Sequence, residues 1–242
     1  MTRSIDMDRE GIWVEDVKIP AVVPEHYSET VEDLDGSIYL STYLKERPIT
    51  AYLQFEIEDG MSMSAFNRHL SGLINPFEHY YLVMDEDPSI RYDVRVTNGY
   101  EIEELSWEDG KFEIEFIMFN PLRESVNLIK KKYTTPSFIF KNEGNRIIDP
   151  RKQAEMELTF KGVSENLTIT NLTTGDVWAF NGKATDLDII KLKSIQSFKN
   201  DSSIFGQSNK KLLTLAVGNN EFIVSGATGS FELVISTRFY FL

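Results

Sequence analysis

The residues of this sequence that could take part in chemistry are its histidines, its carboxylates and its tryptophans. There are three histidines, His26, His69 and His79, and no cysteine. None of the histidines stands at the H-x-x-x-H spacing of a helical metal pair, and Pro76 separates His69 from His79. Without cysteine, a disulfide framework, a thiolate zinc site, an iron–sulfur cluster and a cysteine nucleophile are excluded. We therefore expect neither a metal site nor a cofactor.

Carboxylates are abundant enough to suggest glycoside hydrolysis by a pair of acids. The candidate clusters are Asp85-Glu86-Asp87, Glu101 with Glu103 and Glu104, and Glu108-Asp109. Each cluster lies at a turn or in a polar stretch, whereas a catalytic acid must be buried enough for its pKa to rise. The first cluster also lacks the glycine and the terminal glutamate of an EF-hand calcium loop. We therefore expect no catalytic residue. A glycosidase that uses a pair of carboxylates ranks third among the functions that the sequence suggests.

Trp178, in the segment Asp-Val-Trp-Ala-Phe, is the aromatic residue that would suit a sugar-binding platform. Strand alternation offers a second interpretation, because it places Trp178 and Phe180 on one face and Val177 and Ala179 on the other. Trp178 is therefore a candidate for a saccharide or interface contact, and a position in the core is the alternative.

The composition is that of a folded protein. The chain has 242 residues, of which 41% are hydrophobic and 26% are charged, which suits one or two domains. No charge-free stretch approaches the ~18 apolar residues that a membrane-spanning helix needs. The N-terminal sequence MTRSIDMDRE is charged from its third residue, unlike a secretory signal. We expect a soluble protein of a cytoplasm-like compartment, without membrane contact.

The negative charge is concentrated in the first half of the chain. Residues 1–132 carry 27 Asp and Glu against 13 Lys and Arg, a net charge of -14, whereas residues 133–242 carry 11 against 12, a net charge of +1. This asymmetry predicts two modules with a boundary near residue 132, where Lys130-Lys131-Lys132 leads into Thr134-Thr135-Pro136 and suggests an exposed linker. Because acidic surface repels phosphate, we expect no specific nucleic-acid binding.

Alternation of apolar and polar residues predicts β-strands through most of the chain. In the segment LQFEIE at 53–58 every second residue is apolar, and the pattern recurs at 91–96, 112–116, 167–170 and 231–235. Dipeptides ending in glycine predict hairpin turns between such runs. They are Asp35-Gly36, Asp59-Gly60, Asn98-Gly99, Asp109-Gly110, Thr174-Gly175 and Asn181-Gly182. Short strands with frequent turns favour antiparallel β-sandwiches in both halves.

Two further segments stand out against this pattern. At 62–75, Phe66, Leu70 and Leu73 recur at helical spacing, with Ser62 or Ser64 as the N-cap and Pro76 as the stop. This predicts one amphipathic helix packed on a sheet. The segment 226–230 is rich in small residues but lacks the Gly-Lys-Ser/Thr ending of a phosphate loop, so it predicts another hairpin turn.

The order of strand and turn motifs is similar, along nearly the whole chain, to that of one family. In the first half the motifs are GIWVEDVKIP (11–20), YLKERPITAYLQFEI (43–57), FNRHLSGLINPFEHYYLVMDEDPSIRYDVRV (66–96) and GKFEIEFIMFNP (110–121). In the second half they are FIFKNEGNRIIDPRKQ (138–153), LTITNLTTGDVW (167–178) and LLTLAVGNNEFIVSG (212–226). In this order and spacing they resemble the siphophage distal tail proteins, often called Dit.

The resemblance implies a mainly β fold of two β-sandwich domains. Residues 1–132 would form a ring-forming N-terminal domain with the one packed helix near 62–75, and residues 133–242 a galectin-like C-terminal domain. It also implies a structural hub of a siphophage tail tip or baseplate rather than an enzyme. A homo-hexameric ring would join the tail tube to the tail-tip and receptor-binding machinery and let DNA pass.

The partners that this resemblance implies are the major tail tube protein, the tape measure protein, the tail-associated tip protein and the receptor-binding or baseplate proteins. The protein would be made in the host bacterial cytoplasm and would end in the virion, at the tail tip. We hypothesise that part of the acidic excess in residues 1–132 lines the ring, where carboxylates would keep DNA from adhering. The alternative function is a carbohydrate-binding module that recognises a host cell-wall saccharide.

Overall fold

The computed structural model describes residues 6–57, 60–152 and 154–242, and it is mainly β, as predicted. The chain divides into two compact units. The first unit comprises the chain up to Met84 together with Arg91–Leu122, and the second comprises Asp85–Ile90 with Arg123–Leu242. The predicted boundary near residue 132 therefore lies within the second unit. The predicted linker at Lys130–Lys132 is wrong, because these lysines form a strand paired with the last long strand of the chain.

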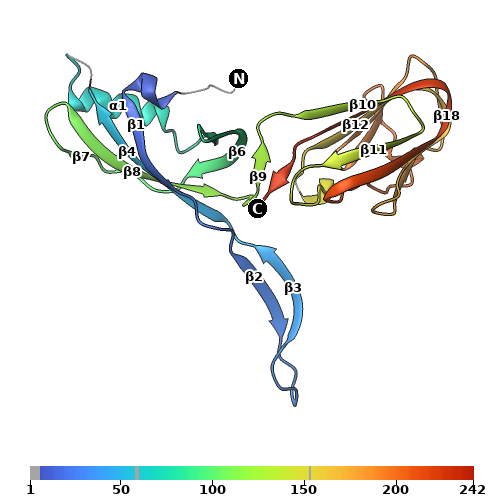
Figure 1. Ribbon diagram of the computed structural model, residues 1–242, viewed down its shortest axis with the longest axis horizontal. Coiled ribbons are helices and arrows are strands. Elements are labelled where there is room, and N and C mark those ends of the chain that lie inside the picture. Colours follow the sequence, from blue (N-terminus) through green and yellow to red (C-terminus); the bar gives the residue numbers. More distant parts are fainter. Residues whose placement is uncertain (1–5, 58–59, 153) are drawn as a thin grey trace. The chain divides into compact units, whose positions relative to one another are not determined.

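The first unit contains a sheet, one α-helix and a separate hairpin (Figure 1). Its elements are η1 (Met7–Glu10), β1 (Ile12–Lys18), β2 (Pro24–Glu29), β3 (Ile38–Leu44), β4 (Arg47–Glu56), α1 (Met63–Leu73), β5 (Tyr80–Met84), β7 (Glu103–Glu104) and β8 (Asp109–Met118). Strand β6 (Asp87–Val96) begins in the second unit and ends in the first.

Strands β1, β4 and β8 lie side by side and antiparallel, and β4 and β8 carry the predicted alternation. Leu53 of β4 pairs with Phe112 of β8, and both side chains are buried. The intervening residues, such as Glu113 and Glu115, are exposed. Strand β4 ends at Glu56. The predicted alternation extends to Glu58 and the predicted turn includes Asp59, and these two residues lie outside the described residues.

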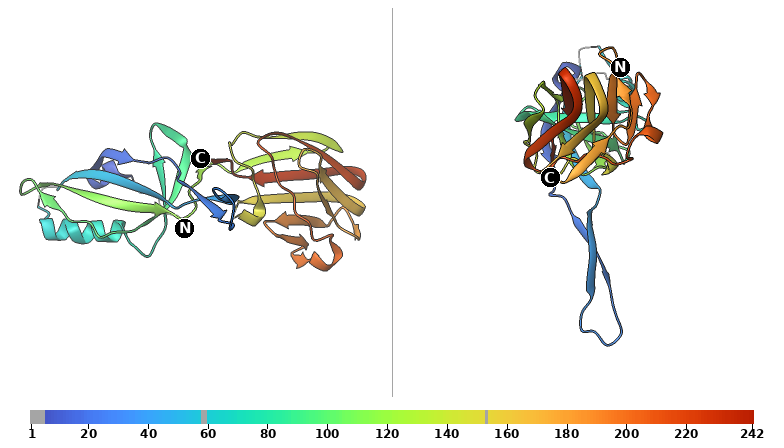
Figure 2. Two further views of the ribbon diagram at one scale, coloured as in Figure 1. Left: turned by 90° about the horizontal axis from the view of Figure 1, so that it is seen from below. Right: turned by 90° about the vertical axis from the view of Figure 1, so that its right-hand side faces the viewer.

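The single helix predicted at 62–75 is confirmed as α1. The Ser62 hydroxyl accepts a hydrogen bond from the Ala65 N–H at 3.3 Å, so it is the N-cap. Phe66, Leu70 and Leu73 are buried, and the Phe66 ring stacks on Phe55 of β4 with centroids 4.2 Å apart. The helix therefore lies along one face of the β4–β8 sheet, as the first view of Figure 2 shows.

The second unit is built on a nine-stranded sheet around two long antiparallel strands, β12 (Met156–Asn171) and β18 (Gly218–Thr237). The other strands of this sheet are β10 (Ile129–Tyr133), β11 (Ser137–Asn142), β13 (Asp176–Ala179), β14 (Lys183–Ala184), β15 (Ile189–Lys193), β16 (Gln196–Lys199) and β17 (Ser202–Ser203). Two short strands, β9 (Arg123–Ser125) and β19 (Tyr240–Phe241), pair with each other outside this sheet. Two short 3-10 helices are η2 (Pro150–Lys152) and η3 (Phe205–Gln207). Fully buried aromatic side chains fill the interior: Phe140, Phe160, Trp178, Phe180 and Phe222.

The segment 226–230 is a bend within β18 and not the predicted hairpin turn. Gly226 has φ +82°, and a Cβ there would meet the Asn166 carbonyl oxygen at 2.6 Å. The pairing register between β12 and β18 shifts on both sides of Ser164. Both strands therefore continue through a bulged region instead of reversing direction, because the glycine permits the bend without ending the pairing.

Only some of the dipeptides ending in glycine adopt the backbone conformation of a tight turn. Gly36 and Gly175 have positive φ angles, as a tight turn requires, whereas Gly99, Gly110 and Gly182 do not. Gly110 lies inside β8, where a Cβ would meet the Phe55 ring at 2.4 Å. Its role is therefore close packing of a ring against the strand and not chain reversal.

The buried hydroxyl of Tyr240 in β19 should make the protein less stable at alkaline pH. Burial raises the pKa of its hydroxyl to about 12, and that hydroxyl accepts a hydrogen bond from the Glu155 N–H at 2.7 Å. Because the unfolded chain loses this proton near its ordinary pKa of ~10, the free energy of unfolding should fall by about 2 kcal/mol between pH ~10 and ~12. Below that window this residue contributes no pH dependence.

Urea denaturation across this range should show a shallower decline for Tyr240→Phe than for the unchanged protein. The exposed Tyr39→Phe is the matched control and should keep the original slope. Identical slopes for all three proteins would contradict the prediction.

Candidate interaction surface

The most unusual surface of the first unit is the hairpin of β2 and β3, residues 24–44, which we call the arm. It continues the ribbon formed by β1 and β4, whose pairing ends at Lys18 and Thr50, and forms a separate two-stranded sheet from Pro24–Leu44 to Glu29–Ile38 (Figure 1). At its base the Lys45 N–H donates to the Val23 carbonyl at 2.9 Å. Among the described strands, none pairs with the outer edge of β2 or β3.

The arm exposes apolar side chains instead of burying them. Tyr39 is 62% exposed, Leu40 57% and Tyr27 54%. Five further residues of the arm and its base are all more than a third exposed: Val31, Leu34, Ile38, Tyr43 and, at the base, Val23. A two-stranded hairpin is marginally stable alone, and contiguous exposed apolar surface marks an interaction site. The second view of Figure 2 shows the arm as a long ribbon with no layer covering it within its unit.

Hydrogen bonds between side chains align the two strands of the arm. The Tyr43 hydroxyl donates to the Glu25 carboxylate, which also pairs with Lys45 at 3.5 Å. The hydrogen bond to Tyr43 holds the pKa of Glu25 below its usual range, and the same bond raises the pKa of Tyr43. The Tyr27 and Tyr43 rings lie 5.3 Å apart. The arm therefore has an ordered surface before any partner covers it.

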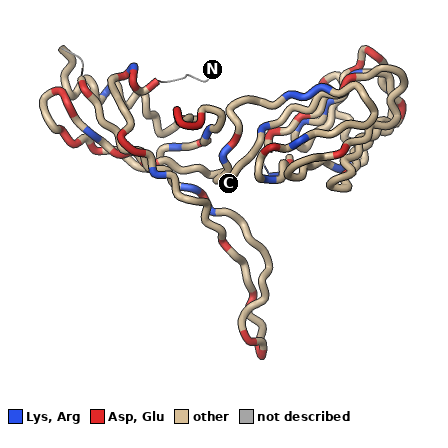
Figure 3. The backbone as a smooth tube through the Cα atoms, viewed as in Figure 1, with Lys and Arg blue, Asp and Glu red and all other residues tan. Residues whose placement is uncertain are grey.

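The arm is also purely acidic. Residues 24–44 contain Glu25, Glu29, Glu32, Asp33 and Asp35 but no lysine or arginine. Figure 3 shows this segment with acidic positions alone. Two arms aligned with each other would repel, so the charge favours a receiving surface of different composition.

Trp178, the predicted saccharide or interface candidate, is fully buried. Its indole Nε1–H donates to the Ser197 hydroxyl at 3.1 Å within the second unit. This corrects the platform interpretation, because the ring presents no face to solvent. The most exposed tryptophan of the described residues is instead Trp107, at 95%, on a turn where the Ser106 hydroxyl donates to the Asp109 carboxylate at 2.8 Å. The sequence could have indicated this exposure, because Trp107 stands in the polar turn Ser-Trp-Glu-Asp.

The structure does not bring the three histidines together. His26 hydrogen-bonds Thr42 on the arm, His69 lies 2.8 Å from Glu10, and His79 lies 3.2 Å from Asp93. Within the described ranges, no group of three or more His, Asp and Glu side chains could hold a metal ion.

The acidic clusters lie on the surface. All residues of Asp85–Asp87, Glu101, Glu103, Glu104 and Glu108-Asp109 are exposed. Glu103 pairs with Lys111 at 3.3 Å, and Asp87 accepts from the Ser89 N–H. None of these carboxylates lies in the buried setting that a general acid needs. In the part of the chain that the structure describes, no helix is long and apolar enough to cross a membrane.

A family model of phage tail proteins matches most of the first unit. Residues 5–118 match the family model described as the phage tail protein RIFT-related domain. The matched segment contains the arm, α1 and the β1–β4–β8 sheet.

One solved structure extends the similarity in fold to nearly the whole chain. The Dit (gp 19.1) protein of phage SPP1 has the same fold, with a TM-score of 0.74 and 13% identity over 96% of this chain and 95% of that protein. Two structures of the phage p2 baseplate in its activated conformation, with Ca and with Sr, align at TM-scores of 0.49 and 0.48, with 8% and 7% identity over 96% and 95% of this chain and 92% of each of those chains. Among curated proteins, no sequence matches. The resemblance to siphophage distal tail proteins is confirmed.

Proposed function

We propose that this protein is a structural hub of a siphophage tail tip, where six copies form a ring. The observation that carries the proposal is the arm, an ordered, apolar and acidic hairpin that its own unit leaves uncovered. The family domain at 5–118 and the fold shared with a distal tail protein support the same role. The proposal assigns binding surfaces to this protein and no catalysis.

A ring follows from the shape of such a contact. When the arm of one copy docks on a different surface of the next copy, the interface is heterologous, and it closes if the rotation between copies divides a full circle. An arm that docked on its own equivalent would instead produce a pair of copies, which the shared acidic charge of the two arms opposes.

The ring would connect the tail tube to the receptor-binding machinery. It would lie at the tail tip of the virion and contact the tape measure and tail-tip proteins. We also propose that carboxylates of the first unit face the channel. Glu56, Glu113 and Glu115 are exposed on the face of β4 and β8 opposite the buried residues and would repel passing DNA. We also propose that the second unit has a galectin-like fold.

The test is the solution mass of the purified protein by light scattering over a series of concentrations and salt levels. We expect a species near six times 27.8 kDa, and electron microscopy should then show a ring. If the protein stays monomeric alone, the measurement is repeated with a tail-tip partner added. A monomer under both conditions would refute the ring.

A further inference from the structure

The outer face of the second unit's sheet contains a trough that the ring proposal does not use. Two adjoining depressions of about 340 and 460 Å³ share Glu157, Lys193 and Ser194. They cross β10, β18, β12, β15 and β16, so the trough is five strands wide. At the ordinary spacing of ~4.8 Å between strands it is roughly 19 Å across, long enough for several units of a polymer.

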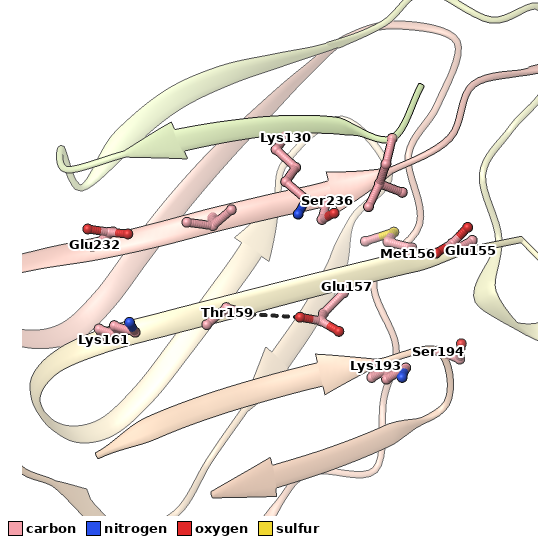
Figure 4. A pocket seen from close by; sticks show the side chains of 12 residues that line it. Lys130, Glu155, Met156, Glu157, Thr159, Lys161, Lys193, Ser194, Glu232 and Ser236 are labelled. Carbon is pink, nitrogen blue, oxygen red and sulfur yellow. Dashed lines mark hydrogen bonds between the residues drawn. The ribbon is translucent and has the colours of Figure 1, made fainter. Parts of the chain in front are cut away.

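The strand register determines which side chains meet in the trough. Lys130 of β10 pairs with Ser236 of β18, which pairs with Glu157 of β12, and Glu157 pairs with Lys193 of β15. Figure 4 shows these side chains on one face, with Lys161 further along β12. Lysines therefore lie on both sides of the trough and on its central strand.

Three of these lysines have no anionic partner. Lys132 pairs with Glu232 and Lys191 with Asp201, but Lys130, Lys161 and Lys193 form neither an ion pair nor a side-chain hydrogen bond among the described residues. All three are exposed. These three lysines place unpaired positive charge on one face of a protein whose net charge is -13, and an anionic ligand would complement it.

The trough also contains hydrogen-bonding groups suited to hydroxyls. The Glu157 carboxylate accepts from the Thr159 hydroxyl at 3.1 Å, which orients it in the trough, and Ser194 and Ser236 also line the trough. A carboxylate accepts hydrogen bonds from ligand hydroxyls but repels a densely charged backbone such as that of nucleic acid. The mixture favours a ligand with widely spaced anionic groups and hydroxyls between them.

We propose that this trough binds an anionic polyol or glycan chain. Lys130, Lys161 and Lys193 pair with successive phosphate or carboxylate groups of the chain, and Glu157 accepts hydrogen bonds from its hydroxyls. Phosphate and carboxylate chains share this chemistry, so two probes distinguish the source of the anionic group. The binding requires the second unit alone and is independent of ring formation.

Isothermal titration of the full chain with a glycerol-phosphate oligomer and with oligogalacturonate, at about 50 and 150 mM salt, tests the proposal. We expect binding to at least one probe, weakened at the higher salt. Lys161→Gln with Lys193→Gln should weaken it at least tenfold. The matched control, Lys152→Gln with Lys211→Gln, removes the same charge from exposed positions outside the trough and should leave binding unchanged.

Glu157→Ala separates this ligand class from a general polyanion. If hydroxyls of the ligand donate to Glu157, this variant should bind the ligand severalfold more weakly. A polyanion without hydroxyls would instead bind more tightly, because the variant lacks a carboxylate that repels it. Three results would overturn the proposal: no binding to either probe at low salt, equal loss in both double variants, or tighter binding by Glu157→Ala. Equally tight binding of single-stranded DNA or polyglutamate, with the same lysine dependence, would also overturn it.

Discussion

A chain in which Asn-Gly replaces the arm, residues 24–44, is expected to fold normally and to lose ring assembly completely. Val23 and Lys45 would then flank a two-residue turn, and they are already hydrogen-bonded neighbours. The body should tolerate the change, because no side chain of β2 or β3 is buried in the core. The fold is checked by circular dichroism and thermal unfolding, and the mass by light scattering.

Point variants distinguish a specific contact of the arm from general surface stickiness. Tyr39→Ser with Leu40→Ser removes apolar surface from the arm, whereas Phe77→Ser with Trp107→Ser removes side chains that are 91% and 95% exposed elsewhere in the first unit. Only the arm variant should reduce assembly. Rings that persist without the arm, or an equal loss in both double variants, would show that another surface holds the copies together.

Trp178→Ala is expected to destabilise the second unit by about 3–5 kcal/mol, the usual cost of deleting a large buried aromatic side chain. The variant loses the packing of a fully buried ring and leaves the Ser197 hydroxyl without its indole donor. Trp107→Ala is the matched control, and its effect should lie within about 0.5 kcal/mol of zero, because that ring touches mainly solvent.

Urea denaturation followed by far-UV circular dichroism measures both values, with the transition of each unit fitted separately. Equal stability of the Trp178→Ala variant and the unchanged protein would mean that this tryptophan does not pack as described. Normal stability combined with lost glycan binding would restore the surface role that the buried position argues against.

The amino-acid sequence determined the local features of this protein. Alternation in 53–57 and 112–116 predicted both the strands and the residues that face the core, because the two-residue repeat of a strand depends only on local geometry. The spacing of Phe66, Leu70 and Leu73 predicted α1 in the same way. The order of motifs also predicted the family resemblance and the mainly β fold.

Only the tertiary structure decided which surfaces are left uncovered. Leucine and isoleucine occur both in the arm and in the core strands, and their exposure depends on whether another layer lies against them. Lys130–Lys132 resembled a linker, yet pairing with β18 makes them a strand. The lysine trough joins residues more than a hundred positions apart in the sequence, because cross-strand register between β10, β18, β12 and β15 brings them together. Long-range pairing is a property of the folded sheet, and no local pattern in the chain contains it.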